Sequence, residues 1–273
     1  MTDFVVSTEI IRSRQNARLK NLRQRLQRPI LGPDRLIALE GDHLIHEAWR
    51  SGLRLHTLFL REDRAAENIP HLSGDVQVFM VAADAFNHAC ATESPQGIAA
   101  LVEAPLSTLE SLLEAPHPQL VILAGLQDPG NVGTIIRSAE AFAATGVLLT
   151  PGSASPWNQK ALRASAGSTF RLPIVSLPDN VPLQRLSAQH IPLYACVARA
   201  GTSIFDADLR GSRAFVIGNE GAGIPDEILS LCHGLLHIPC PGNVESLNAA
   251  IAASILLCEV SHQRSQASLK GKP

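Results

Sequence analysis

Four polar residues crowd the start of one of the most apolar stretches of the sequence. In CPGNVESLNAAIAASILLCE, Asn243, Glu245, Ser246 and Asn248 precede a run that is almost wholly apolar. A run that is apolar on every side predicts a buried helix, here from about residue 245. Asn243 or Ser246 can cap such a helix, but a cap explains only one polar residue. Unpaired polar groups beside a buried helix are costly, so we expect this cluster to line a ligand site.

A second loop combines glycines with an amide and an acidic side chain. In FVIGNEGAGIPDEI, Gly218, Gly221 and Gly223 bracket Asn219 and Glu220. A turn before the following helix needs only one or two glycines. Three of them around an Asn-Glu pair predict a backbone that wraps closely around a ligand.

A third loop, LQDPGNVGTIIRSAEAF, has the same character. Gly130 and Gly133 allow close approach of a ligand or another chain, and Asn131 can cap the helix that follows. Arg137 stands six residues further on, in an otherwise apolar helix. Arginine is rarely buried without a partner, so we expect its guanidinium to point into a polar site.

Other residue types that carry chemistry form no recognisable set. His43, His46 and Glu47 lack the H-E-x-x-H order of zinc proteases, and the five cysteines include no C-x-x-C pair. We therefore expect no metal site. An odd cysteine count without a disulfide framework favours a reducing cytoplasm. The strand-to-helix G-x-G-x-x-G fingerprint, the P-loop and the G-x-S-x-G elbow are missing, which counts against a nucleotide-binding oxidoreductase and the commonest hydrolases.

Composition indicates a globular protein of one large or two ordinary domains, with 273 residues, 45% of them hydrophobic. The net charge of -2 gives no global nucleic-acid signal. The longest apolar run, 249–258, is too short to span a membrane, and Met1–Phe4 lacks the basic-then-apolar order of a secretion signal.

One segment departs from this near-neutral balance. RSRQNARLKNLRQRLQR, residues 12–28, carries seven basic and no acidic side chains, with Leu19, Leu22 and Leu26 at helical spacing. This predicts an amphipathic basic helix. The charges are either a solvated helix face or an arm that contacts phosphates.

The hydrophobic pattern predicts two α/β regions on either side of a proline-containing linker. Strands and helices alternate between Leu36 and Val102, which predicts a small α/β domain over 33–103, preceded by a basic helical segment over 1–32. Residues 104–118 hold three prolines and predict a linker with one short helix. A second domain covers 119–273.

Six apolar strands are expected in this second domain. They are LVILAG, GVLLT, LPIVS, PLYACV, RAFVIG and GLLHIP, with helices at about 131–144, 158–166, 182–189, 226–232 and 245–262. Apolar strands without alternation predict a parallel sheet covered on both faces.

Taken together, the three loops resemble the signature motifs of the SpoU (TrmH-type) RNA ribose 2′-O-methyltransferases of the SPOUT superfamily. The matching segments are NVGTIIRSAEAF, FVIGNEGAGIP and IPCPGNVESLNAAIAASILLCE. The resemblance implies an α/β fold whose C-terminal parallel-sheet domain carries a deep trefoil knot. It also implies S-adenosylmethionine as cofactor, a homodimer formed through the C-terminal domain, and an active site at the dimer interface. The preceding small α/β domain resembles the family's RNA substrate-binding domain.

The resemblance also assigns residues. Arg137 matches the family's catalytic arginine, and the other polar motif positions expected in the active site are Asn131, Glu220, Ser246 and Asn248. Cofactor contacts are expected at Gly218, Asn219, Ile238, Gly242 and Leu247.

RNA phosphates are expected to meet the basic residues of the N-terminal segment and those beside the first motif loop. These candidates are Arg14, Arg18, Lys20, Lys160, Arg163 and Arg171. Solvent-exposed helix charges are the alternative for the last three. Ribosomal RNA is the expected substrate and transfer RNA the next, while a non-catalytic RNA-binding assembly protein is the alternative that keeps the same fold.

Overall fold

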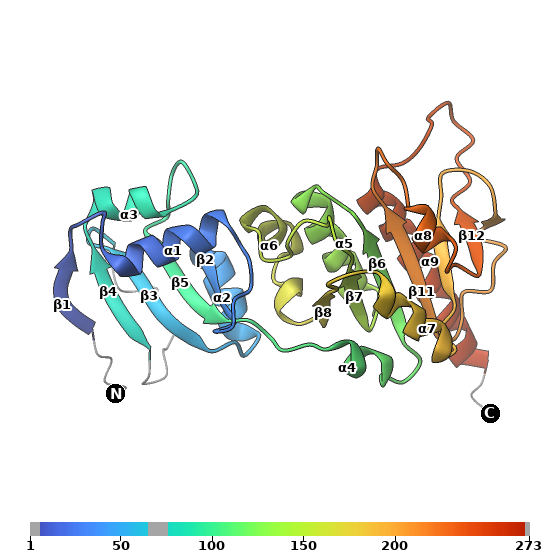
Figure 1. The fold of residues 1–273 in the computed structure, drawn as a ribbon, viewed down its shortest axis with the longest axis horizontal. Coiled ribbons are helices and arrows are strands. Elements are labelled where there is room, and N and C mark those ends of the chain that lie inside the picture. Colours follow the sequence, from blue (N-terminus) through green and yellow to red (C-terminus); the bar gives the residue numbers. More distant parts are fainter. Residues whose placement is uncertain (1–5, 65–75, 271–273) are drawn as a thin grey trace. The chain divides into compact units, whose positions relative to one another are not determined.

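The computed structural model of the protein describes residues 6–64 and 76–270 (Figure 1). The chain forms two compact units, one from Met1–Pro105 with Trp157–Phe170 and the other from Leu106–Pro156 with Arg171–Pro273. Residues 1–5, 65–75 and 271–273 lie outside the described residues, including parts of the domains predicted over 1–32, 33–103 and 119–273 and the segment examined for a secretion signal.

Unit 1 contains a five-stranded sheet of order β1-β4-β3-β5-β2. Its strands are β1 Val6–Ile11, β2 Leu36–Glu40, β3 Leu55–Arg61, β4 Gln77–Val81 and β5 Ile98–Glu103. Strand β5 runs antiparallel to β2 and β3, whereas β4 runs parallel to β1 and β3, so the sheet is mixed. Strand β1 lies in the range 1–32, which was predicted to be helical. The strand was missed because its polar Ser-Thr-Glu centre hides the apolar pattern of a strand.

Helices cover both faces of this sheet. They are α1 Ala17–Gln27, α2 Asp42–Arg50, α3 Ala83–Ala89 and α6 Gln159–Ser165, with a 3-10 turn, η2, at Ser168–Phe170. The predicted basic helix is confirmed as α1, whose leucines 19, 22 and 26 are buried against α3 and one face of the sheet. Helix α2 packs on the other face.

The segment 157–170 packs on the same sheet face as α2, although it lies within the range 119–273 in sequence. Trp157, Leu162 and Phe170 join the core formed by α2 and the sheet. Gln159 Nε2 donates a hydrogen bond to the carbonyl of Ala38 on β2, at 2.8 Å. This pairing explains why a polar side chain is buried there.

Unit 2 contains a seven-stranded sheet of order β10-β12-β9-β11-β6-β7-β8. Its strands are β6 Gln119–Ala124, β7 Gly146–Leu149, β8 Ile174–Ser176, β9 Leu193–Cys196, β10 Thr202–Ser203, β11 Arg213–Gly218 and β12 Gly234–His237. Every pairing in it is parallel, which confirms the predicted parallel sheet. Because all strands run the same way, their carboxyl ends meet at one edge of the sheet.

Two helical layers enclose this sheet. The helices are α4 Leu109–Leu113, α5 Pro129–Ala141, η3 Val181–Leu183, α7 Gln184–Ala188, α8 Asp226–Leu229 and α9 Ala249–Lys270. Helices α5 and α9 pack together on one face, and α4, α7 and α8 cover the other. The short helix expected in the linker is confirmed as α4. No helix among the described residues has the length and apolar character to cross a membrane.

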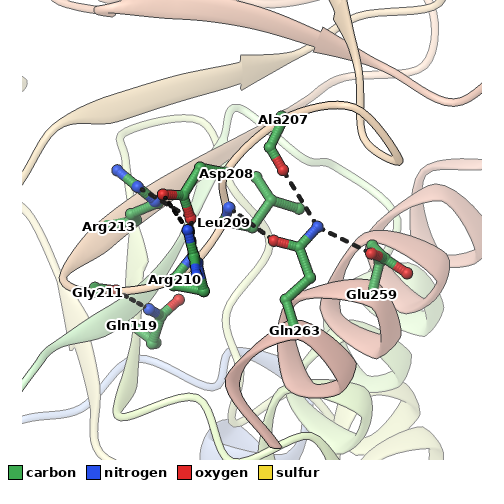
Figure 2. Close-up of polar contacts among 9 residues, drawn as sticks. All are labelled: Gln119, Ala207, Asp208, Leu209, Arg210, Gly211, Arg213, Glu259 and Gln263. Atoms are coloured by element: carbon green, nitrogen blue, oxygen red, sulfur yellow. Dashed lines mark hydrogen bonds and ion pairs between the residues drawn. The ribbon is translucent and has the colours of Figure 1, made fainter. Parts of the chain in front are cut away.

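Helix α9 is fastened to the segment that follows β10 (Figure 2). Gln263 Oε1 accepts a hydrogen bond from the backbone amide of Leu209 at 2.9 Å, and its Nε2 donates to the carbonyl of Ala207 at 3.1 Å. The same nitrogen also donates to Glu259 Oε1, one turn earlier, at 2.8 Å. One side chain therefore holds the loop across the helix.

Ion pairs also connect residues of this loop with the start of β11 (Figure 2). Asp208 accepts hydrogen bonds from Arg210 Nε and Nη2 at 2.9 and 3.0 Å, with Arg213 Nη2 3.9 Å away. The side-chain hydrogen bonds from Arg210 lead the causes that lower the pKa of Asp208 to about 2. Gln119 Nε2 donates to the carbonyl of Gly211, which ties the end of the loop to β6.

Candidate functional site

A cavity of about 840 Å³ lies at the carboxyl edge of the sheet in unit 2. Its walls come from the segments after β9, β11 and β12 and from the start of α9. This edge is where open parallel sheets bind their ligands. The first and second loops singled out in the sequence therefore share one cavity.

Three side chains from distant parts of the chain form a polar network beside the cavity. Glu220, which lines the cavity, accepts hydrogen bonds at Oε1 from Asn131 Nδ2 and from Asn248 Nδ2, the latter at 2.8 Å. Asn248 Nδ2 also donates to Asn131 Oδ1 at 3.1 Å. The amide of Ala249 lies 3.4 Å from the same carboxylate oxygen, so the charge of Glu220 faces the positive end of α9. The network joins all three motif loops.

The helix caps differ from those expected. Helix α5 is capped by Asp128, whose Oδ1 accepts from the amide of Gly130 at 2.9 Å, so Asn131 lies inside the helix. Helix α9 begins at Ala249 rather than near residue 245, because Asn248 Oδ1 accepts from the next amides, those of residues 250 and 251, at 3.0 and 3.2 Å. The alternative role of Asn131 as a cap, and the caps considered possible at Asn243 or Ser246, are thus wrong. Asn131, only 9% exposed, needs its network partners instead.

The loop after β11 is a tight turn organised by Asn219. Its Oδ1 accepts from the amides of Gly221 and Ala222 at 2.9 and 3.0 Å, and its Nδ2 donates to the carbonyl of Gly125 at 3.1 Å. Gly223 has φ +71°, a conformation that favours glycine. A Cβ on Gly218 would lie 2.7 Å from the Gly223 carbonyl carbon. Local geometry therefore accounts for Gly218 and Gly223.

The loop before α9 keeps its polar groups available. Among the described residues no hydrogen bond or ion pair engages Asn243, Glu245 or Ser246, and all are exposed. Glu245 and Ser246 line the cavity. These groups can therefore meet a ligand without first breaking a contact.

Predicted cofactor contacts fall mostly on the cavity wall. Gly218, Asn219, Ile238 and Leu247 line it, whereas Gly242 does not and has open space around it. Burial raises the pKa of Cys196, another wall residue, to about 11, so its thiol adds no charge at neutral pH.

Arg137 lies apart from this cavity within its own chain. It is exposed on α5, and no hydrogen bond or ion pair engages it within 6–64 and 76–270. The adjacent Ser138 hydroxyl contacts that of Ser254 on α9 at 2.7 Å. Arg137 is thus presented on an open surface formed by α5 next to α9.

All six predicted phosphate contacts are exposed, but several are already engaged. Arg14 Nε donates to Asp84 at 2.8 Å, and Arg171 forms two hydrogen bonds to Glu140 at 2.6 and 2.9 Å. The guanidinium carbon of Arg18 lies 4.5 Å from the centre of the Phe79 ring.

The remaining three lie on unit 1. Lys20 is on α1, and Lys160 and Arg163 are on α6. The side chains of Lys20 and Arg163 form no hydrogen bond or ion pair among residues 6–64 and 76–270. These two are therefore the cations most ready to meet a phosphate.

Sequence reasoning missed two wall residues, Arg199 and His237. Each follows or ends a strand that was predicted, β9 and β12. A position at the carboxyl end of a parallel strand was the signal that could have found them. Within the described part of the chain, no three His, Cys, Asp or Glu side chains are grouped closely enough to hold a metal ion.

Known protein families and relatives share the sequence of this chain in both units. The family model described as SpoU rRNA Methylase family matches residues 118–258, and that of the MRM3-like substrate binding domain matches residues 16–100. The 23S rRNA (guanosine(2553)-2′-O)-methyltransferase RlmP of Bacillus subtilis is 36% identical over 80% of this chain and 86% of its own length. An uncharacterized tRNA/rRNA methyltransferase of Synechocystis is 31% identical over 96% of both chains.

Solved structures agree with the sequence matches. The SpoU methyltransferase AviRb from Streptomyces viridochromogenes, in complex with AdoMet, superposes with a TM-score of 0.81 at 27% identity. The match covers 94% of this chain and 100% of AviRb.

Proposed function

The chain belongs to the SpoU rRNA Methylase family, and from this premise we propose that it is an S-adenosylmethionine-dependent enzyme that methylates a ribose 2′-hydroxyl of ribosomal RNA. The observation that carries the proposal is the meeting of Asn131, Glu220 and Asn248 beside one cavity at the carboxyl edge of the sheet. Both similar proteins compared by sequence are named as RNA methyltransferases. A substrate in the ribosome and the free cysteines support a cytoplasmic enzyme.

The cavity suits S-adenosylmethionine in size and lining. Its volume of about 840 Å³ lies within the range of small-molecule sites. Ile238 and Leu247 offer apolar walls, and Gly218 and Asn219 bring backbone close to the ligand. We propose that these four residues hold the cofactor, with Gly242 at the margin. When bound, the cofactor would supply a methyl group on its sulfonium. The neutral thioether that remains is a good leaving group.

What the protein must add is alignment and removal of the hydroxyl proton. Oε1 of Glu220 is occupied by the network, whereas Oε2 forms no hydrogen bond within the described chain and can accept one from the ribose 2′-hydroxyl. Asn131 and Asn248 fix the carboxylate, and Ser246, exposed on the cavity wall, is placed to contact the ribose or cofactor.

We propose that Arg137 acts as an electrostatic clamp. A guanidinium stays protonated at neutral pH and is a poor base, but it binds phosphate and stabilises a developing alkoxide well. Arg137→Ala should therefore reduce methyl transfer by about 10²–10³-fold while RNA binding persists. A near-normal rate would refute this role.

Arg137 is proposed to act on a second copy of the chain. Helix α9 exposes Ile251 (53%) and Cys258, and the preceding loop exposes Val244 (55%). An apolar surface of this kind beside an unengaged arginine is suited to cover by another protomer. We propose a homodimer through these elements, in which the partner subunit's Arg137 completes each site.

Mixing two inactive variants tests the dimer. If Arg137→Ala and Glu220→Ala chains exchange randomly, half of the dimers are mixed and each holds one intact site, so about a quarter of wild-type activity should return. Recovery of no activity, with mixed dimers shown by mass spectrometry, would place Arg137 in the site of its own chain. Ile251→Asp should yield monomers in sedimentation.

The trefoil knot is proposed from family membership. Two features support it: β12 lies between β10 and β9 in the sheet, and α9 is hydrogen-bonded to the segment after β10. Pulling the two ends of the chain in optical tweezers tests it. A knotted chain should extend to a contour length shorter than its residue count requires, and full extension would refute the knot.

Unit 1 is proposed to bind the RNA substrate, since it matches a substrate-binding domain. Lys20 and Arg163 are the first candidates to test, with Arg14, Arg18, Lys160 and Arg171 as further contacts. Replacing one phosphate-contacting cation should reduce the slope of the logarithm of the RNA-binding constant against the logarithm of the salt concentration by about one.

The decisive experiment transfers labelled methyl from S-adenosylmethionine to unmodified ribosomal RNA and, separately, to transfer RNA. Label in one alkali-resistant dinucleotide of ribosomal RNA is the expected result. Label in transfer RNA alone would change the substrate. Cofactor binding without transfer to either RNA would indicate another RNA, and loss of both would favour a non-catalytic RNA-binding assembly protein.

A further inference from the structure

Arg199 lies on the cavity wall in the loop after β9. We infer that its guanidinium binds the carboxylate of the methionine part of S-adenosylmethionine and so positions the cofactor. The inference rests on the proposed function and adds to it the residue that recognises the anionic end of the cofactor.

The charges on the wall point to this role. Glu220 and Glu245 both line the cavity, and Arg199 is the lone arginine or lysine among the described residues that line it. S-adenosylmethionine carries one anionic group, its carboxylate. The two wall carboxylates suit its cationic ammonium and sulfonium, whereas its carboxylate needs a cation, and a guanidinium can meet it with two parallel hydrogen bonds.

Arg199 is also unengaged, which sets it apart from most arginines of unit 2. Within residues 6–64 and 76–270 no hydrogen bond, ion pair or ring contact engages it. Other arginines of this unit have partners: they are Arg171, Arg185, Arg210, Arg213 and Arg264. Arg137, the proposed clamp for RNA, is the other exception. Both guanidinium groups are therefore available to bind an anion from outside the described chain.

The backbone beside Arg199 holds an unusual conformation. Ala200 and Gly201 have φ values of +76° and +78°. The left-handed conformation is unfavourable for alanine, and such strain concentrates at functional sites. The amide of Val197 donates to the carbonyl of Leu236 at 2.9 Å, which fixes the root of the loop. The loop therefore has a defined backbone conformation beside the cavity.

Titration calorimetry with two ligands tests the inference. S-adenosylhomocysteine carries the carboxylate, and 5′-methylthioadenosine has the same adenosine part without it. Arg199→Ala should raise the Kd for S-adenosylhomocysteine about tenfold and leave the Kd for 5′-methylthioadenosine within about twofold. Arg199→Lys should recover part of the loss. Arg185→Ala, which removes an exposed arginine paired with Glu110 away from the cavity, is the control and should change neither Kd.

The pattern of losses decides the outcome. Equal weakening of both ligands would overturn the inference, because it would indicate contact with the adenosine part or damage to the loop, and circular dichroism would identify the latter. Unchanged binding of both would also overturn it. Raising the salt concentration should weaken S-adenosylhomocysteine binding in the wild type more than in Arg199→Ala. Failure of the wild-type protein to bind either ligand would refute the proposed function itself.

Discussion

Replacing Asn131 by alanine removes the link between α5 and the other two motif loops. The substitution deletes the hydrogen bond from Nδ2 to Glu220 and the one that Oδ1 accepts from Asn248. Hydrogen bonds to a charged group contribute about 1.5–3 kcal/mol and neutral ones about 1 kcal/mol. Glu220 keeps its bonds from Asn248 and from the backbone, so the lower end applies.

We therefore expect Asn131→Ala to lower the free energy of unfolding by about 2 kcal/mol. For a unit of this size the midpoint of thermal unfolding should fall by about 4–8 °C. If the network is needed only to hold the site, single-turnover methyl transfer should fall by no more than about thirtyfold, the same energy expressed as a rate. Asn131→Asp, which keeps the volume but sets a second carboxylate beside Glu220, should be at least as harmful.

A double-mutant cycle isolates the contact. Unfolding of Asn131→Ala, Glu220→Ala and the double variant, followed by urea titration, should give a coupling energy of about 1 kcal/mol. Additive effects would refute the hydrogen bond as a source of stability. Wild-type stability of Asn131→Asp would refute the assignment of Nδ2 as the donor to Glu220.

Three further predictions concern unit 2. Gln263→Ala should lower the free energy of unfolding by about 1–3 kcal/mol in urea titration, because it leaves a buried backbone amide without its acceptor; an unchanged midpoint would show the loop held by other contacts. The ionised form of Asp208 is stabilised in the folded state by Arg210, and its low folded pKa means that this contribution is present above about pH 4 and is lost as the pH falls through about 2. The side chain is exposed, so the stability difference between wild type and Asp208→Asn should be below about 1 kcal/mol at pH 6 and vanish only below about pH 2. A difference constant with pH would contradict the linkage. Gly218→Ala should weaken S-adenosylhomocysteine binding and destabilise the fold by about 1–3 kcal/mol, because its Cβ would press on backbone, whereas Gly242→Ala, with open space around it, should do neither; equal effects in calorimetry would refute the steric argument.

The parallel sheet was predictable because its main strands are uninterrupted apolar runs. β6 is buried at every position, and β11 is buried along its centre. β9 and β12 are only partly buried, but their side chains are mostly apolar. β10 has two residues, too few for any periodicity to appear. The packing of 157–170 on unit 1 was also beyond reach. The apolar character of Trp157 and Phe170 predicts that they are buried, but it does not tell which sheet they cover.

The candidate site was predictable in its residue types but not in its wiring. Asn131 and Asn248 were both singled out, yet either could be a cap, and only the backbone decides which amides lie within reach. Asp128 takes the cap of α5, which frees Asn131 for Glu220. Arg199 was missed because a single arginine in a loop is unremarkable until its neighbours on the cavity wall are known.

Asn248 both caps α9 and completes the polar network, so helix formation and network formation are linked in time during synthesis. Its oxygen starts α9, and its nitrogen completes the contacts to Glu220 and Asn131. Residues 131 and 220 leave the ribosome well before α9 does. A chain still being made can therefore fold much of the sheet while the network stays incomplete. Helix formation at α9 and completion of the site therefore become a single step, which must wait until residue 248 and the helix that follows it have been made.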